Sequence, residues 1–139
     1  MKAISTLAGL LFCGVMTSTH AADVKVTVNN LKAGTGKVYA SLCKSEQFMV
    51  SRCDFEIVRA VSQDQAQLVF NNLAAGQYAV SIFYDVNNNG KLDSSLFGIP
   101  EEPTGTSNNV VAKNGPPSFT DAAFSLEANQ QHTLTIDVY

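Results

Sequence analysis

The strongest strand signal in the chain is Gln77-Tyr78-Ala79-Val80-Ser81-Ile82-Phe83-Tyr84. Successive side chains of an extended strand point to opposite sides. Tyr78, Val80, Ile82 and Tyr84 therefore share one face, and Ala79, Ser81 and Phe83 share the other. Both faces are largely apolar, which is typical of a strand with neighbours on both sides. The stretch therefore predicts a central strand of a β-sheet.

Shorter runs of alternating apolar and polar residues flank this strand and predict further strands. No stretch shows a helical period over three turns. The other expected strands are residues 24–28, 38–43, 55–61, 67–70, 119–126 and 132–138. Seven short strands separated by turn residues indicate an all-β fold. We expect an antiparallel sandwich of about seven strands, of prealbumin-like or immunoglobulin-like type.

The N-terminus has the three-part layout of a secretory signal peptide. Lys2 supplies a positive charge, residues 4–15 are an apolar core, and Thr19-His20-Ala21-Ala22 offers small residues for cleavage after Ala21 or Ala22. We therefore expect a cleaved signal at residues 1–22 and one β-sandwich domain at residues 23–139, in the periplasm or secreted. A lipoprotein alternative would use Cys13, but the bulky Phe12 precedes it.

The charge of the mature chain argues against two classes of partner. The chain has 9 basic and 12 acidic residues, so loss of Lys2 with the signal leaves eight basic ones. No basic patch stands out, which argues against nucleic acid and against anionic membrane surfaces. After the signal, no apolar run is long enough for a membrane span.

Cys43 and Cys53 remain after signal cleavage, whereas Cys13 leaves with the signal. An even pair of cysteines in an oxidising compartment favours a disulfide. The alternative is a metal or redox pair. Against it, the spacing is not that of a C-x-x-C motif and no histidine lies nearby.

The residues that follow the central strand have the spacing of a calcium loop. They read D-x-N-x-N-G-x-x-D over residues 85–93. Calcium takes six to eight oxygen ligands, and side chains at alternate positions of a tight loop can converge on one ion. The candidate ligands are Asp85, Asn87, Asn89, the main-chain carbonyl of Lys91, and Asp93, with Gly90 at the sharp turn.

The match to an EF-hand loop ends before the twelfth position. Leu96 stands where a bidentate Glu is needed, and a strand rather than a helix leads into the loop. The missing carboxylate would come from Glu101 or Glu102. Such a set predicts modest affinity, roughly 10⁻⁴–10⁻³ M. The alternative is a plain Asn- and Gly-rich turn between strands.

Other chemistry-bearing residues have weaker signals. Glu101 and Glu102 are adjacent acids, which on a loop are more often solvated or metal ligands than catalytic. His132 sits in an expected strand without a Ser-His-Asp order. Four aromatic side chains of the strands offer a sugar platform, although strand aromatics more often belong to the core. These are Tyr39, Tyr78, Phe83 and Tyr84.

Three groups of motifs resemble one known family. The first is Leu73-x-x-Gly76-x-Tyr78-x-Val80-x-x-Phe83-x-Asp85-x-Asn87-x-Asn89-Gly90-Lys91-Leu92-Asp93. The others are Phe97-Gly98-Ile99-Pro100-x-Glu102 with Gly105-x-Ser107-Asn108-Asn109, and Pro117-Ser118-Phe119-x-x-Ala122-x-Phe124. Together they resemble the bacterial secreted family catalogued as domain of unknown function 2141. The resemblance implies a small β-sandwich and no established activity.

Two further resemblances concern single features. The Leu-x-x-Gly-x-Tyr approach to a strand is similar to prealbumin-like and carboxypeptidase-regulatory-like sandwiches. The 85–93 loop resembles calcium loops of sandwich repeats in bacterial surface adhesins. The prealbumin likeness raises hydroxyisourate hydrolysis, which relies on a His/Arg/Ser set and a C-terminal Tyr-Arg-Gly-Ser. This chain ends Ile136-Asp137-Val138-Tyr139 and keeps one mature histidine, so we discount that activity.

We therefore expect a non-enzymatic binding or accessory module at the cell envelope, with calcium as cofactor and a protein or carbohydrate as ligand. Loops on a rigid sandwich are the usual place for binding. One alternative is a small hydrolase that uses Glu101 or Glu102 with Asp93. Another is a structural envelope subunit that pairs through an exposed edge strand.

Overall fold

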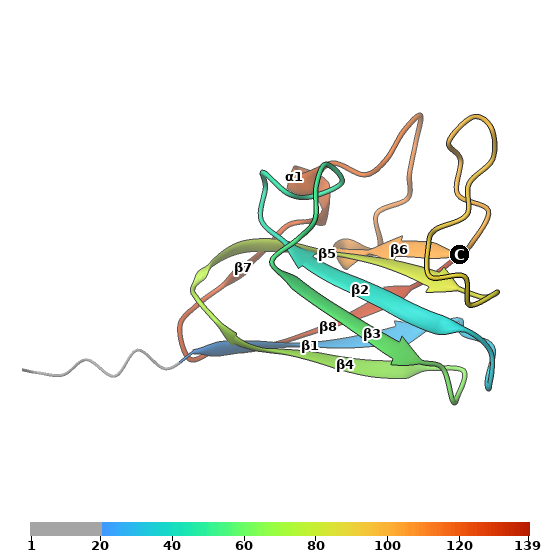
Figure 1. The fold of residues 1–139 in the computed structure, drawn as a ribbon. Coiled ribbons are helices and arrows are strands. Elements are labelled where there is room, and N and C mark those ends of the chain that lie inside the picture. Colours follow the sequence, from blue (N-terminus) through green and yellow to red (C-terminus); the bar gives the residue numbers. More distant parts are fainter. Residues whose placement is uncertain (1–20) are drawn as a thin grey trace, which may run out of the picture.

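Two β-sheets pack face to face in the computed structural model, which describes residues 21–139 (Figure 1). The three-stranded sheet has the order β4 (Ala66–Leu73), β1 (Ala22–Asn29), β8 (Gln131–Asp137). The five-stranded sheet has the order β3 (Phe55–Ala60), β2 (Lys37–Cys43), β5 (Gly76–Asp85), β6 (Thr104–Thr106), and β7 (Phe124–Leu126) also pairs with β5. The predicted all-β sandwich is confirmed. The predicted signal peptide falls almost entirely on residues 1–20, outside the described residues.

One pairing departs from the expected antiparallel pattern. β1 and β8 run parallel, with Val24 opposite His132 and Val28 opposite Ile136. Alternation of apolar residues shows which face of a strand is buried, but it carries no information about the direction of a neighbour. Parallel neighbours need a long crossover connection, and here the chain from β2 to β7 supplies it.

The core lies between the sheets and follows from the alternation seen in the sequence. Val24, Val26 and Val28 on β1 are fully buried, while the residues between them are partly exposed. Leu42, Leu68 and Ile136 meet them from other strands. Burial of one apolar face per sheet is the main stabilising term of such a sandwich.

The predicted central strand is confirmed. β5 pairs with β2 along one side and with β6 and β7 along the other. Its inner face places Tyr78 and Tyr84 in the core, where both are nearly fully buried. The Tyr78 hydroxyl donates to the Ala74 carbonyl at 2.8 Å, and the Tyr84 hydroxyl donates to the Thr35 carbonyl at 2.8 Å. These two tyrosines support the core and cannot form a surface sugar platform.

The stretch 119–126, expected as one strand, is divided into two elements. It forms the short helix α1 (Phe119–Ala122) followed by β7. The Ser118 hydroxyl caps the helix by accepting from the Asp121 N–H at 3.2 Å and contacting the Asp121 carboxylate at 2.7 Å. Serine followed three residues later by an acid is a variant of the capping box, and it outweighs the strand propensity of the apolar residues.

The long segment expected to be loop contains β6 and a 3₁₀ turn, η1 (Ser107–Asn109). Asn109 lies beside the free edge of β8: its Oδ1 accepts from the Asp137 N–H at 2.9 Å, and its Nδ2 donates to the Thr135 carbonyl at 3.3 Å. A covered edge does not offer unpaired backbone groups to other chains. This is the structural role of Asn109 in the Ser107-Asn108-Asn109 motif.

Ser107 joins this turn to the central strand. It is fully buried, and its hydroxyl accepts from the Val80 N–H at 2.9 Å and donates to the Ala122 carbonyl. We expect Ser107→Ala to lower the free energy of unfolding by about 1–3 kcal/mol, because it leaves a buried N–H and a buried carbonyl without partners. Urea denaturation measures this, with the exposed Ser125→Ala as control. Equal stability of the two variants would contradict the assigned role.

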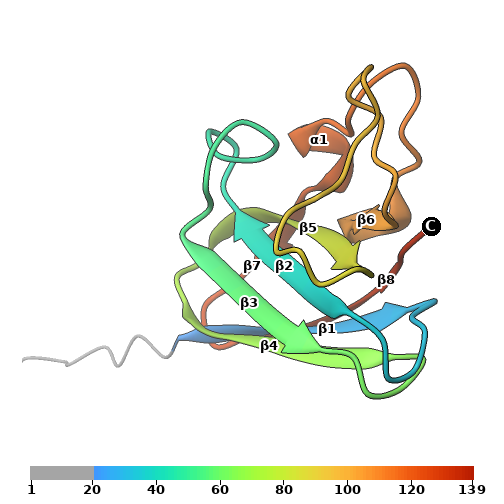
Figure 2. The same cartoon turned by 45° about the vertical axis from the view of Figure 1, so that its right-hand side comes forward.

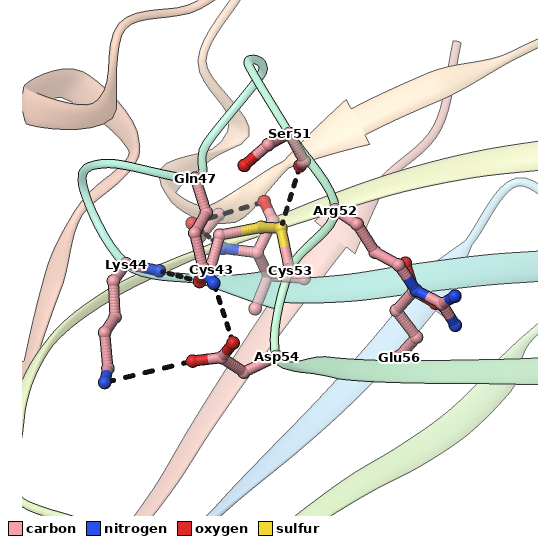
Figure 3. Close-up of a disulfide and its surroundings, with 10 residues drawn as sticks. Cys43, Lys44, Gln47, Ser51, Arg52, Cys53, Asp54 and Glu56 are labelled. Atoms are coloured by element: carbon pink, nitrogen blue, oxygen red, sulfur yellow. Dashed lines mark hydrogen bonds and ion pairs between the residues drawn. A yellow bond between two sulfur atoms is a disulfide. The ribbon is translucent and has the colours of Figure 1, made fainter.

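A second, smaller apolar cluster covers part of the outer face of the five-stranded sheet. Cys43, Phe48, Ala79 and Ala122 are buried in it. The predicted Cys43–Cys53 disulfide is present and closes the segment between β2 and β3 (Figure 3). Phe48 meets Phe119 edge to face, with ring centroids 6.0 Å apart. The disulfide and α1 thus hold two loops against the same sheet.

Candidate functional site

The 85–93 loop begins at the last residue of β5, inside the protein. Asp85 is fully buried. Its Oδ2 accepts from the Gly90 N–H at 2.9 Å, and its Oδ1 accepts from the Asn89 N–H at 3.2 Å. Gly90 has φ of +81°, a conformation that glycine adopts without steric cost. The buried carboxylate therefore organises the turn that the sequence predicted at Gly90.

Three further predicted ligands converge above this turn. The side-chain nitrogens of Asn87 and Asn89 both donate to Asp93 Oδ2, at 2.6 Å and 2.7 Å. The amide oxygen of Asn87 accepts from the Asn89 N–H at 3.1 Å, and that of Asn89 accepts from the Lys91 N–H at 3.1 Å. Asparagine side chains commonly bond the backbone two residues ahead in this way. The result is a tight loop around one carboxylate.

Glu102 is the acid that reaches the loop. It is 8% exposed, and its two carboxylate oxygens accept from the Val86 N–H at 2.9 Å and the Asp93 N–H at 3.2 Å. Glu101 is exposed, and its backbone N–H donates to the Asp93 carbonyl at 2.9 Å. Both glutamates lie in a bend before β6, so the sequence could not determine which of them faces the loop.

The electrostatics of the loop depend on backbone groups and amides. Within residues 21–139 the ion pairs are Lys44–Asp54 and Arg52–Glu56, which lie elsewhere. Asp85, Asp93 and Glu102 are instead held by N–H donors. In the same described region, no group of three or more His, Cys, Asp or Glu side chains is placed to hold a metal ion. Any ion would therefore depend on the asparagine oxygens.

The donor set partly fits a calcium ion. Asn87, Asn89 and Asp93 already converge, with the two amide nitrogens toward Asp93 and the two amide oxygens toward backbone N–H groups. To give an ion two neutral oxygens beside the carboxylate, both amides would have to turn over and release those backbone hydrogen bonds. Asp85 and Glu102 keep acceptor capacity beyond their backbone bonds, since each carboxylate has about four acceptor positions. Glu101 and Lys91 are both exposed.

An aromatic pair lies next to the loop on the outer face of the five-stranded sheet. Tyr39 of β2 and Phe83 of β5 are cross-strand partners, and their rings stack with centroids 4.6 Å apart and planes 6° apart. A Cβ added at Gly90 would lie 3.8 Å from the Tyr39 hydroxyl. Each ring covers one face of the other, so the pair offers less flat surface to a sugar than two separate rings would.

His132 has a structural environment. It is partly buried on β8, and its ring stacks on Phe124 with centroids 4.6 Å apart and parallel planes.

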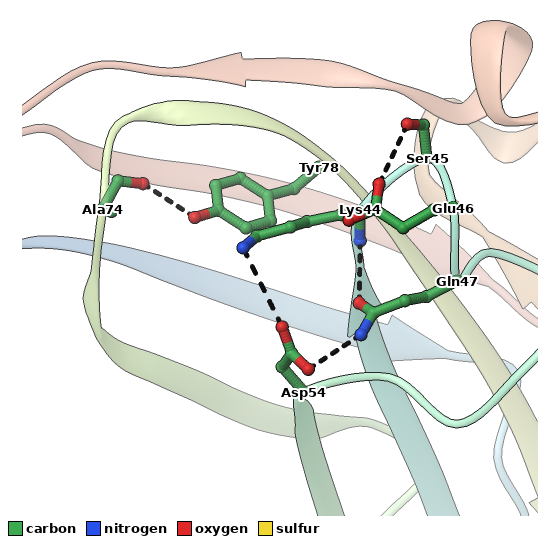
Figure 4. Close-up of polar contacts among 7 residues, drawn as sticks. All are labelled: Lys44, Ser45, Glu46, Gln47, Asp54, Ala74 and Tyr78. Atoms are coloured by element: carbon green, nitrogen blue, oxygen red, sulfur yellow. Dashed lines mark hydrogen bonds and ion pairs between the residues drawn. The ribbon is translucent and has the colours of Figure 1, made fainter.

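A cavity of about 440 Å³ lies on another part of the surface and was not predicted from the sequence. Its lining includes Lys44, Glu46, Tyr78 and Phe119. Figure 4 shows the polar contacts around it, in which Gln47 Nε2 and Lys44 Nζ both approach Asp54, at 2.7 Å and 3.9 Å. The disulfide-closed loop forms one wall, so the cavity exists only after tertiary folding.

Within the described part of the chain, no helix is long and apolar enough to cross a membrane.

A family model matches residues 26–134 of the chain, which span the sandwich from β1 to β8 and include the 85–93 loop. The family is DUF2141, described as an uncharacterized protein conserved in bacteria. The chain belongs to this family. No curated protein and no solved structure matches the chain. Membership of DUF2141 agrees with the resemblance seen in the motifs, and the family description names no activity.

Proposed function

We propose that this DUF2141 chain is a secreted or periplasmic, non-enzymatic binding module of the cell envelope, with a structural calcium site in the 85–93 loop. The observation that carries the calcium proposal is the convergence of Asn87 and Asn89 on Asp93, within 2.7 Å. Asp85 and Glu102, whose carboxylates accept from backbone N–H groups of the same loop, would supply the further oxygens. The ion would hold the loop in place and perform no reaction.

The disulfide supports the proposed location. Disulfides persist in oxidising compartments such as the periplasm and the extracellular space, and Cys43 and Cys53 form one. The N-terminal sequence has the layout of a secretory signal. We propose that the ligand face lies at the calcium loop and the neighbouring Tyr39–Phe83 pair, where a protein or carbohydrate would bind.

Calcium should bind with modest affinity and raise the melting temperature of chelator-treated protein. With a dissociation constant of roughly 10⁻⁴–10⁻³ M, 10 mM calcium stabilises the folded state by about 1.4–2.7 kcal/mol. Isothermal titration calorimetry should show saturable heat, and thermal denaturation should show the matching shift.

Asp93→Asn should abolish both effects, because it removes the carboxylate on which both amides converge. Glu127→Gln is the matched control: Glu127 is also an exposed loop acid, but it directly follows β7, whose Leu126 pairs with Gly76 at the opposite end of β5 from Asp85. If calcium gives the wild-type protein neither a heat of binding nor a higher melting temperature, the calcium site is refuted.

A further inference from the structure

The two most exposed large apolar side chains of the described residues, Leu96 and Phe97, are neighbours at the tip of one loop, and Ile99 follows them. Leu96 is 102% exposed, Phe97 is 90% exposed and Ile99 is 63% exposed. They belong to residues 94–100, hereafter the tip segment, which contains no charged residue. Exposed apolar residues scattered singly are normal, whereas a contiguous group marks an interaction site.

Hydrogen bonds hold the tip segment in a fixed shape. The Ser95 N–H donates to the Ile99 carbonyl at 2.8 Å, and the Gly98 N–H donates to the Ser95 carbonyl at 2.9 Å. The Ser95 hydroxyl accepts from the Ile99 N–H at 3.3 Å, and Gly98 has φ of +74°. The apolar side chains are therefore presented on an ordered turn, so their exposure does not come from a lack of structure.

The base of the tip segment is anchored in the sandwich. Ser94 pairs with Pro100 across the turn, and the Asp93 carbonyl accepts from the Glu101 N–H. Next to it, the buried Glu102 carboxylate binds two backbone N–H groups. Figures 1 and 2 show this loop, in gold, rising above the five-stranded sheet on the side away from the three-stranded sheet.

We propose that the tip segment inserts into the surface of a neutral phospholipid bilayer and attaches the module reversibly to a membrane. An aromatic side chain offers about 150–250 Å² of contact area, so the three side chains together offer on the order of 500 Å². A stable protein–protein interface needs about 800 Å² from each partner. The tip is therefore small for a protein partner, whereas a bilayer needs no complementary surface.

The charge around the tip indicates which kind of bilayer fits. Lys91 is the nearest basic residue in sequence, and Glu101 is the nearest exposed acid. These opposite charges flank an uncharged turn, so no cationic patch selects anionic lipids. Attachment rests on burial of apolar area and is therefore weakly sensitive to salt. Membrane attachment does not depend on the calcium site, because hydrogen bonds within the protein already shape the tip segment.

The chain has no tryptophan, so Phe97→Trp introduces a single fluorescent reporter at the tip. On addition of phosphatidylcholine vesicles, its emission should shift to shorter wavelength, and lipids brominated in their acyl chains should quench it. Val69→Trp is the matched control, because Val69 is exposed on β4 in the opposite sheet. That variant should show neither effect.

Co-sedimentation with the same vesicles measures the contribution of the apolar side chains. The double substitution Leu96→Ser with Phe97→Ser should lower partitioning at least about tenfold, because each buried apolar side chain contributes that much or more. Both positions are exposed, so folding should be unaffected, which urea denaturation checks.

Two results would overturn the bilayer inference. One is unchanged Phe97→Trp emission with vesicles. The other is an emission shift that appears without lipid and grows with protein concentration, which would assign the tip to a second copy of the chain. Each measurement is run with calcium and with chelator, which separates the two proposals. If the protein binds vesicles but calcium gives no heat in calorimetry, only the calcium site is refuted. If calcium gives heat but the protein does not bind vesicles, only the bilayer site is refuted.

Discussion

Gly36→Ala should lower the free energy of unfolding by about 3 kcal/mol or more. Gly36 has φ of +72° and lies against the start of the 85–93 loop. A Cβ there would overlap the Asp85 carbonyl oxygen and would lie 2.9 Å from a ring carbon of Tyr84 and 3.0 Å from the Val86 Cα. Two of these contacts are backbone atoms, which cannot move aside as a side-chain end can.

Gly34→Ala is the matched control for this substitution. Gly34 has the same φ of +72°, and nothing lies within 4 Å of the position that its Cβ would take. Gly34→Ala should cost only the backbone strain, about 1 kcal/mol. Urea denaturation of both variants measures the difference. Equal losses would show that the turn conformation alone matters and that Gly36 does not support the loop by close packing.

Removal of the Cys43–Cys53 disulfide should have the other large effect. The two cysteines are 10 residues apart, and closing a loop of that size stabilises a protein by roughly 2–3 kcal/mol, chiefly by restricting the unfolded chain. The double substitution Cys43→Ala with Cys53→Ala should therefore lower the free energy of unfolding by about that amount. Denaturant titration under non-reducing conditions measures it.

Wild-type protein titrated with and without a reductant provides the control, because reduction breaks the same bond without changing a side chain's carbon skeleton. Hydrogen exchange should locate the native-state change in residues 44–54, which pack through Phe48 on the small outer cluster. A stability loss below about 1 kcal/mol in both experiments would mean that this cluster holds the segment without the bond.

Much of the fold was predictable because its signals are local. The alternation of apolar and polar residues predicted β1, β2, β4, β5 and β8, because burial of one face of a strand imposes a period of two. The apolar character of both faces of β5 indicated its central position, which the pairing confirms. The disulfide was predicted from an even pair of cysteines in a chain expected to be secreted. The prediction of a single strand over residues 119–126 was wrong, because Ser118 caps a short helix at this point.

The candidate site was only partly predictable. The spacing of residues 85–93 indicated a tight loop organised by oxygen-bearing side chains, and Asp85, Asn87, Asn89 and Asp93 do organise it. Whether the loop binds calcium stays a prediction. The choice between Glu101 and Glu102 depended on how the chain returns to β6, which no local pattern encodes.

The sequence by itself determined the longer strands, their buried faces and the sharp turn at Gly90, because these depend on neighbouring residues and on the backbone preferences of glycine and asparagine. Only the tertiary structure decided that β8 lies parallel to β1, that Glu102 is buried against the loop, and that Leu96 and Phe97 remain outside. An apolar side chain in a sequence is expected to be buried. Here the hydrogen-bonded turn of residues 94–100 presents these two to solvent, almost fully exposed.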